Sequence, residues 1–333
     1  MVPMAKSSDG LLKVSRLAKK FPVSEALFRA RRQYVHAVNG VSFTLAPGKT
    51  VGLVGESGCG KSTIARLICL LDQPSAGDLF FEGRNLSDFS AREKQAYHRS
   101  VQLVFQNPYA SLNPRMRVGQ ALREILKVHR ICPRQEMDSR IRKLLETVGL
   151  SAESRWRFPF EFSGGQRQRL CLARALAVEP SVIICDEPVS ALDVSVQAQI
   201  LKLLKAIQQQ RNLAYLFISH DLSVVYHICD EVLVMYAGRI VERGPVESVF
   251  SQPGHPYTQA LLSAIPTIEA GSGRKRIILS GELPNLNQLP PGCPFYSRCF
   301  RREPVCQSEK PPRISRGSQQ IECWLYAKHP ESI

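Results

Sequence analysis

The hydrophobic and polar positions of the chain follow two alternating patterns. Short apolar runs bounded by turn residues are typical of strands, and such runs occupy Leu11–Phe21, Ala37–Leu45, Thr50–Val54, Asp78–Glu82, Val101–Phe105, Ser181–Cys185, Ala214–Ser219 and Glu231–Tyr236. Apolar positions three and four apart are typical of helices, and they recur in Thr63–Leu71, Phe162–Ala177 and Leu201–Gln209. Strands alternating with helices predict an α/β fold with a mostly parallel, doubly wound sheet.

One block interrupts this alternation, because Arg117–Leu150 has a charged, helical pattern. Its apolar residues form two stripes at helical spacing, one of Val118, Leu122, Ile125 and Leu126 and one of Ile141, Leu144 and Leu145. The block predicts a small helical insert between two parts of the α/β core.

A glycine-rich segment satisfies the P-loop pattern G-x-x-x-x-G-K-[ST]; it consists of Gly55, Glu56, Ser57, Gly58, Cys59, Gly60, Lys61, Ser62 and Thr63. A predicted strand precedes it and a predicted helix follows, with Ile64, Leu67, Ile68 and Leu71 on one face. In such a loop the backbone N–H groups cradle phosphate, Lys61 reaches the β- and γ-phosphates, and the Ser62 hydroxyl binds Mg²⁺. A purely structural turn is the alternative, which the flanking strand and helix disfavour.

Two adjacent carboxylates, Asp186 and Glu187, follow an apolar strand. Open α/β sheets present catalytic groups at the carboxyl ends of their strands. Alone, such a pair is more often a helix cap or a solvated strand end. With a P-loop upstream, the pair predicts nucleotide hydrolysis, with one carboxylate holding Mg²⁺ and the other polarising water.

In its motifs, the chain resembles the nucleotide-binding subunit of an ATP-binding cassette (ABC) transporter over about residues 12–245. After the P-loop come a Q-loop glutamine (Gln106), a signature (Ser163, Gly164, Gly165, Gln166), the acidic pair, a D-loop (Ser190 to Asp193) and a switch histidine (His220). Phe162 stands where the family usually has Leu. The resemblance implies a P-loop, RecA-like core with an antiparallel β subdomain and a helical subdomain at about 107–165, followed by a small cysteine-containing extension at 246–333.

The resemblance also implies a mechanism and a role for each motif. Two subunits close head to tail, so that each ATP is held by one P-loop and by the opposing signature. Glu187 orients or deprotonates the attacking water, His220 contacts the γ-phosphate, and Mg²⁺ is held by Ser62, Gln106 and Asp186. Asp193 belongs to the nucleotide-binding set. Adenine stacks on Phe21 or on Tyr34, and the sequence does not choose between them because a basic insertion, Phe28–Arg32, separates the two.

A narrower resemblance is to the dipeptide/oligopeptide (Dpp/Opp-type) importers, most like their F-type ATPase subunit. It is carried by Val104–Pro114, by His255–Leu262, and by the tail segments Leu279–Pro284 and Gly292–Phe295. It implies an ATPase that powers peptide import, with a homologous second ATPase subunit in a head-to-tail heterodimer, two transmembrane permease subunits and an extracytoplasmic substrate-binding protein. Nickel, glutathione or another small solute is the alternative cargo, since specificity lies in the partners.

The composition bounds these expectations. The formal net charge of +15 raises the possibility of an acidic partner, such as nucleic acid or anionic lipid. A soluble ABC ATPase acting on nucleic acid is therefore the rival class, but no nucleic-acid-binding motif accompanies the charge, so no nucleic acid is expected. Neither a span of about 18 apolar residues nor a signal-peptide core in Met1–Lys20 is present. We expect a peripheral protein on the cytoplasmic face of the inner membrane.

Four of the ten cysteines, Cys293, Cys299, Cys306 and Cys323, crowd into the tail with spacing C-x₅-C-x₆-C-x₁₆-C. Four thiolates hold an iron–sulfur cluster or zinc, and structural zinc usually has tighter pairs. Some peptide-importer tails carry a [4Fe–4S] cluster, and the resemblance therefore favours that cluster over zinc or reduced thiols. The tail is expected to have too few apolar residues to fold by packing alone.

A final expectation concerns Asn107–Met116, which is rich in Pro and Asn. Its apolar residues Leu112 and Met116 are expected to dock onto a permease subunit rather than fill this protein's own core.

Overall fold

The structure is a computed structural model that describes residues 10–23, 33–106, 111–265, 276–282 and 284–328. The described residues form two compact units. We call the unit that contains the signature motif the signature unit; it comprises the described residues within Met1–Leu12, Thr44–Thr50 and Phe81–Ile218. We call the unit that contains the P-loop the P-loop unit; it comprises the described residues within Lys13–Phe43, Val51–Phe80 and Ser219–Ile333. None of the helices in the described ranges is long and apolar enough to cross a membrane.

The P-loop unit contains two sheets. In one, the strands lie in the order β2-β1-β4; in the other, the order is β11-β12-β10-β9-β3, with β3 parallel to β9 and the remaining pairs antiparallel. The strands are β1 (Leu12–Pro22), β2 (Tyr34–Leu45), β3 (Thr50–Val54), β4 (Ala76–Phe81), β9 (Glu231–Tyr236), β10 (Arg239–Pro245), β11 (Arg313–Arg316) and β12 (Gln319–Glu322). The helices are α1 (Lys61–Ile68), α8 (Leu222–Ile228), α9 (Val246–Ser251), α10 (Pro256–Ser263), α11 (Val305–Ser308) and α12 (Leu325–Lys328).

The helix after the P-loop is shorter than its apolar spacing suggests. Ile64, Leu67 and Ile68 are buried as predicted, but Leu71 is 51% exposed and lies beyond α1. Leu70 adopts a left-handed backbone (φ 54°), and the N–H of Leu71 turns back to the carbonyl of Arg66. Such a left-handed residue ends a helix, so the predicted end at Leu71 was wrong.

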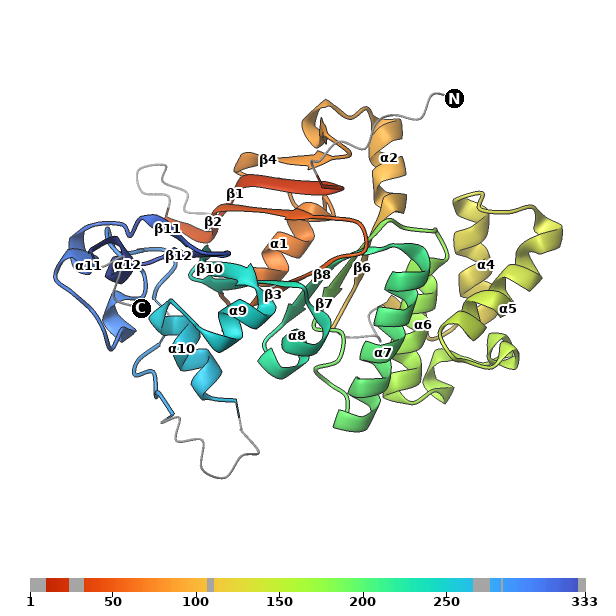
Figure 1. Ribbon diagram of the computed structural model, residues 1–333. Coiled ribbons are helices and arrows are strands. Elements are labelled where there is room, and N and C mark those ends of the chain that lie inside the picture. The colour runs from red at the N-terminus through yellow and green to blue at the C-terminus, as the bar shows by residue number, and fades with distance from the viewer. Residues whose placement is uncertain (1–9, 24–32, 107–110, 266–275, 283, 329–333) are drawn as a thin grey trace. The chain divides into compact units, whose positions relative to one another are not determined.

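The tail, residues 246–333, is joined to the rest of its unit by strand pairing. Strand β12 pairs antiparallel with β10, with Glu242 opposite Ile321, and β11 pairs with β12 (Figure 1). Ile321, Cys323 and Tyr326 form a buried cluster that partly buried apolar side chains cover. The tail thus has a small apolar cluster, and the expectation that packing alone does not fold it stays a prediction.

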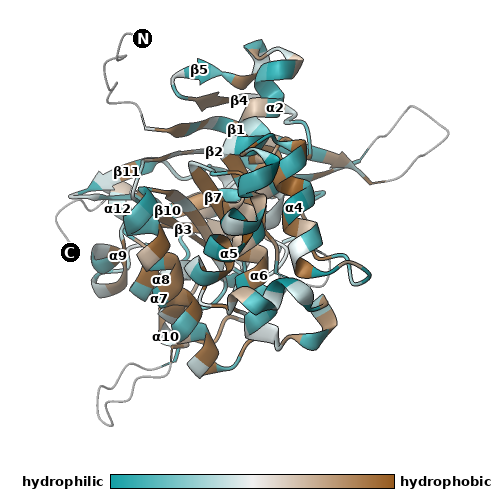
Figure 2. Ribbon diagram, turned by 90° about the vertical axis from the view of Figure 1, so that its right-hand side faces the viewer, coloured by the Kyte–Doolittle hydropathy of each residue, from teal (hydrophilic) through white to brown (hydrophobic). Residues whose placement is uncertain are grey.

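The signature unit has a parallel sheet of order β8-β7-β6, in which Val182 pairs with both Val101 and Ala214. Its strands are β5 (Arg84–Asn85), β6 (Val101–Val104), β7 (Val182–Asp186) and β8 (Ala214–Ser219), and its helices are α2 (Ala91–Ser100), α4 (Val118–Val128), α5 (Met137–Thr147), α6 (Gly164–Leu176) and α7 (Val194–Arg211). The predicted helical insert contains α4 and α5, and both helices show hydrophobic and hydrophilic residues in Figure 2. Helix α7 begins earlier than the expected Leu201, because Asp193 caps it.

Candidate functional site

The P-loop lies between the fully buried strand β3 and helix α1. Gly60, the N-cap of α1, has φ 109°, and a Cβ there would lie 2.1 Å from the carbonyl oxygen of Ala37. Gly55 has φ 153°, and its Cβ would lie 2.2 Å from the carbonyl oxygen of Met235. Any larger side chain would collide with backbone at both positions, so the sequence pattern has a direct steric cause.

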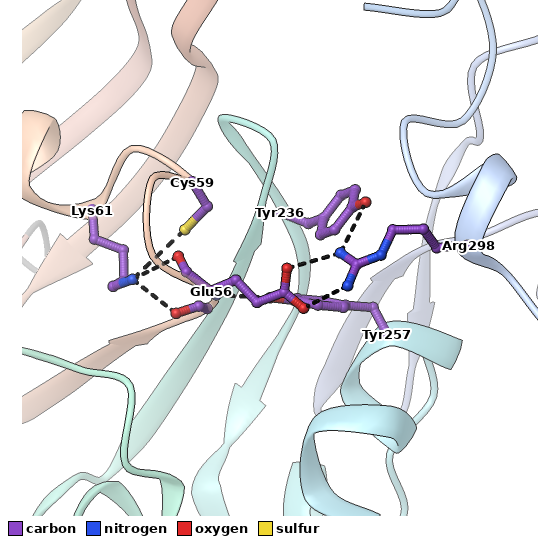
Figure 3. A network of polar contacts seen from close by, with 7 residues as sticks. Glu56, Cys59, Lys61, Tyr236, Tyr257 and Arg298 are labelled. Atoms are coloured by element: carbon purple, nitrogen blue, oxygen red, sulfur yellow. Dashed lines mark hydrogen bonds and ion pairs between the residues drawn. The ribbon is translucent and has the colours of Figure 1, made fainter. Parts of the chain in front are cut away.

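Lys61 points back into this loop. Its Nζ donates to the carbonyl oxygens of Gly55 (2.8 Å) and Glu56 (2.9 Å) and lies 3.9 Å from the sulfur of Cys59 (Figure 3). Burial raises the pKa of the Cys59 thiol, although the ammonium of Lys61 opposes this. The loop thus wraps a single ammonium at a helix N-terminus, and these residues fit a phosphate group. Ser62, the expected Mg²⁺ ligand, is exposed at the start of α1.

The acidic strand end is in the signature unit. Asp186 ends β7, and Glu187 follows with a left-handed backbone (φ 49°) and an N–H that donates to the carbonyl of Ile218. Gln106 Nε2 donates to Glu187 Oε2 (2.8 Å) and to Ser190 Oγ (3.3 Å). The structure therefore brings the predicted Q-loop glutamine directly onto the predicted catalytic carboxylate.

The signature motif opens helix α6. Ser163 Oγ accepts from the N–H of Gln166, and Gln166 Oε1 accepts from the N–H of Ser163, which together form a capping box. Gly165 is close to α7, because a Cβ there would lie 2.3 Å from a methyl of Val196. Asp193 caps α7 through Val196, and its bond from the Ser195 hydroxyl lowers the pKa of its carboxyl. Ser163 and Gly164 stay exposed at the N-terminus of α6.

The structure also describes the switch histidine and the two adenine candidates. His220 is exposed directly after β8 and belongs to the P-loop unit. Of the adenine candidates, Tyr34 is 36% exposed, and Phe21 has the Lys19 ammonium over its ring at 4.9 Å. The basic insertion Phe28–Arg32 lies outside the described residues.

The proposed docking segment is only partly described, since Asn107–Ala110 fall outside the described ranges. The carbonyl oxygen of Ser111 accepts from Arg174 (2.7 Å). Leu112 lines a small cavity of the signature unit together with Leu122 and Leu170. Leu112 is half-buried and does not belong to the buried core, so docking onto a permease stays a prediction for Leu112 and Met116.

The four tail cysteines form no disulfide bond in the structure. The N–H of Cys293 donates to the carbonyl of Cys306 (2.8 Å). Burial raises the thiol pKa to about 11 at Cys293 and to about 12 at Cys323, and it also raises the pKa of Cys299. Across the described part of the chain, however, no group of three or more His, Cys, Asp or Glu side chains is arranged to hold a metal ion. The present arrangement therefore does not fit the expected [4Fe–4S] cluster.

Sequence reasoning missed two residues that contact the P-loop. The N–H of Glu56 donates to Tyr257 Oη (2.8 Å), and the Glu56 carboxylate is paired with Arg298. Tyr257 stands inside the segment His255–Leu262, whose resemblance to peptide importers was its only signal. No motif or spacing in the sequence around Arg298 pointed to a contact with the P-loop.

Comparisons with known proteins agree with this geometry. Residues 38–190 match the ABC transporter family, and residues 241–306 match the oligopeptide/dipeptide transporter C-terminal region. The chain is 48% identical to DppF, the dipeptide transport ATP-binding protein of Escherichia coli K12, over 94% of both chains. It is 44% identical to AppF, the oligopeptide transport ATP-binding protein of Bacillus subtilis 168, over 97% of this chain and 99% of that one.

Two solved structures show the same fold. CbiO1 from Clostridium perfringens, part of the ABC transporter complex cbiONQ, has a TM-score of 0.64 and 28% identity over 73% of this chain and 92% of that chain. The ATP-binding cassette MJ0796 bound to ADP and Pi has a TM-score of 0.61 and 24% identity over 71% of this chain and 98% of that chain. The predicted α/β cassette fold is confirmed by these likenesses.

Proposed function

The chain belongs to the family of ATP-binding subunits of dipeptide and oligopeptide ABC transporters, and we propose how its residues couple ATP hydrolysis to peptide import. It is an ATPase coupled to transport, and its substrate is ATP, which such enzymes typically bind together with Mg²⁺. The observation that carries the residue assignment is the bond from Gln106 to Glu187, which holds the carboxylate at the end of a buried strand. Nickel and glutathione are the alternative cargoes.

In this proposal, Gly55–Thr63 bind the phosphates, Lys61 neutralises them, and Ser62, Gln106 and Asp186 would hold Mg²⁺. Glu187 is the general base for the attacking water, and Gln106 orients its carboxylate. His220 contacts the γ-phosphate. Ser163, Gly164, Gly165 and Gln166 present a helix N-terminus to the γ-phosphate of a second, homologous subunit, and Asp193 supports that helix interface.

Permease partners follow from the family, and the finer assembly is part of the proposal. We propose a head-to-tail heterodimer of ATPase subunits beneath two permease subunits, with a substrate-binding protein on the opposite side of the membrane. The subunit would lie at the cytoplasmic face of the inner membrane. Residues 12–245 would form the cassette, with a helical subdomain at about 107–165, and 246–333 the extension.

A [4Fe–4S] cluster on Cys293, Cys299, Cys306 and Cys323 is a separate proposal that rests on the spacing of these cysteines and on the family. Their described arrangement does not support it. No step of the ATP reaction depends on such a centre.

The substitution Glu187→Gln tests the assignment of the base. The amide retains the size of the side chain but does not accept the proton of water, so ATP binding is retained while steady-state turnover by the assembled transporter falls by at least about a hundredfold. Glu179→Gln, at an exposed surface ion pair of the same unit, is the matched control and retains turnover. Near-normal hydrolysis by the Glu187 variant would refute the assignment.

A further inference from the structure

The tail holds the P-loop through an arginine–carboxylate pair. Arg298 Nη1 donates to Glu56 Oε2 at 2.8 Å, and Nη2 donates to Glu56 Oε1 at 3.1 Å (Figure 3). Arg298 lies at the end of a short 3₁₀ helix, Tyr296–Arg298, and only 8% of its side chain is exposed. The Glu56 side chain is 27% exposed, so the pair is partly shielded from water. Bidentate arginine–carboxylate pairs are among the stronger and more directional ion pairs in proteins.

All the polar groups of Glu56 are held at once. Its N–H donates to Tyr257 Oη, its carbonyl oxygen accepts from Lys61 Nζ, and its carboxylate binds Arg298. Two of these three partners belong to the tail. The conformation of the P-loop at Glu56 is therefore set jointly by the tail and by the lysine that faces the phosphate site.

The guanidinium of Arg298 is fixed by aromatic side chains. It lies over the ring of Tyr236, with its central carbon 5.9 Å from the ring centroid, and Nη1 is also 3.5 Å from Tyr236 Oη. Phe295, 1% exposed, packs edge-on against Tyr236 and in a tilted geometry against Tyr257. These aromatic contacts orient the guanidinium of Arg298 toward the carboxylate of Glu56.

Charge gives this pair a consequence for nucleotide binding. Glu56 is the only acidic residue in Gly55–Thr63, a loop whose proposed ligand is a polyphosphate anion. An unpaired carboxylate in that loop would repel the phosphates, because like charges oppose each other most where water is partly excluded. The paired guanidinium cancels this repulsion.

We propose that Arg298 is a positioning residue of the ATP site, through which the tail neutralises and orients Glu56 and thereby sets the affinity for nucleotide. The inference rests on the proposed function of Gly55–Thr63 as the phosphate-binding loop. It gives the tail a role in the ATPase cycle that requires no metal.

The test uses the full-length chain and calorimetric titration with the Mg²⁺ complex of the non-hydrolysable analogue AMP-PNP. Arg298→Gln is expected to raise the dissociation constant about tenfold, the loss typical of one hydrogen-bonded charge pair. In the assembled transporter, KM for ATP rises by a similar factor while kcat is retained. Arg302→Ala is the matched control, because Arg302 is an exposed arginine of the same segment whose side chain lies over Tyr296.

A second substitution separates charge compensation from a merely structural role. In a Glu56→Gln chain there is no carboxylate to neutralise, so adding Arg298→Gln should change the dissociation constant by less than about twofold. An equal loss in both backgrounds would overturn the proposal, as would an unchanged affinity of the single Arg298 variant. Urea unfolding followed by Trp324 fluorescence in a Trp156→Phe background shows whether Arg298→Gln destabilises the fold. If it does, Arg298→Lys is used in its place, and the retained charge should retain the affinity for nucleotide.

Lys61→Ala distinguishes this proposal from the function on which it rests. Loss of analogue binding in that variant is expected, because it removes the cation of the phosphate cradle. Binding by Lys61→Ala at parental affinity would refute the phosphate site itself. Loss in Lys61→Ala without loss in Arg298→Gln would refute only the role of the tail.

Discussion

His255 makes the stability of the tail depend on pH. It is 1% exposed at the N-cap of α10, where its Nδ1 accepts from the N–H of Tyr257 (3.0 Å). Burial lowers the pKa of its imidazole from 6.5 to about 3. The folded chain therefore keeps a neutral ring through mildly acidic pH, while the unfolded chain binds a proton below about pH 6.5.

The sign and size of the effect follow from this difference. The stabilising contribution is complete above pH 6.5 and is lost as pH falls toward 3, because only the unfolded state gains a proton in that window. One pH unit corresponds to about 1.4 kcal/mol, so lowering the pH from 7 to 5 should reduce the free energy of unfolding by about 2 kcal/mol.

Urea unfolding followed by Trp324 fluorescence measures this change in the tail, with Trp156→Phe removing the other tryptophan. His255→Asn preserves an N-cap acceptor but does not titrate, so its stability should lose the acid dependence due to this ring. Glu242, whose pKa is raised by burial, titrates in both chains and cancels in the comparison. His227→Asn, at an exposed histidine, is the control. Parallel pH profiles for the parental and His255→Asn chains would refute the argument.

Three further predictions concern packing, docking and metal content. Phe295→Ala should lower the free energy of unfolding by about 3–5 kcal/mol through the cavity it leaves, whereas Phe300→Ala, at a 49% exposed ring, should change it by less than about 1 kcal/mol; equal effects would contradict the packing described. Met116→Cys and Leu112→Cys should each form a disulfide with a cysteine-substituted permease in membranes; failure of every such pair would end the docking hypothesis. The separate [4Fe–4S] proposal, which the described arrangement does not support, requires about four iron and four sulfide per chain in anaerobic preparations, lost on replacing any tail cysteine with serine; zinc without iron would favour a zinc site, and the absence of both metals would leave reduced thiols.

Local patterns were sufficient for most of the strands. Ala214–Ser219 and Glu231–Tyr236 have the predicted bounds, and Leu12, Val14 and Leu17 are buried. In β1 the alternation of buried and exposed positions is broken between Val14 and Leu17, where Arg16 has φ 46°. A kink of this type inserts an extra residue into the alternation, and an ordinary arginine gives no sign of it in the sequence.

The candidate site divides in the same way. The P-loop glycines, the capping residue Ser163 and the acidic pair could be predicted from the sequence, because each satisfies a local backbone requirement at fixed spacing. Arg298 and Glu56 were not paired in advance, because they lie 242 positions apart and their charges resemble those of any surface residue. Phe105, expected at the end of a buried strand, is 40% exposed, because β6 ends at Val104 where its pairing with β7 stops.

Because of the left-handed backbone at Glu187, selection for stability and selection for function favour different residues at this position. A glutamate at φ 49° costs the fold about 1–2 kcal/mol, whereas glycine occupies that region without a steric penalty. Random variation screened only for resistance to heat should therefore drift away from glutamate at this position. Cells that depend on peptides as nutrients would restore it. Under the proposed role of Glu187 as general base, selection on the carboxylate maintains this position, and a descendant of the chain that had lost the glutamate for heat resistance would be inactive.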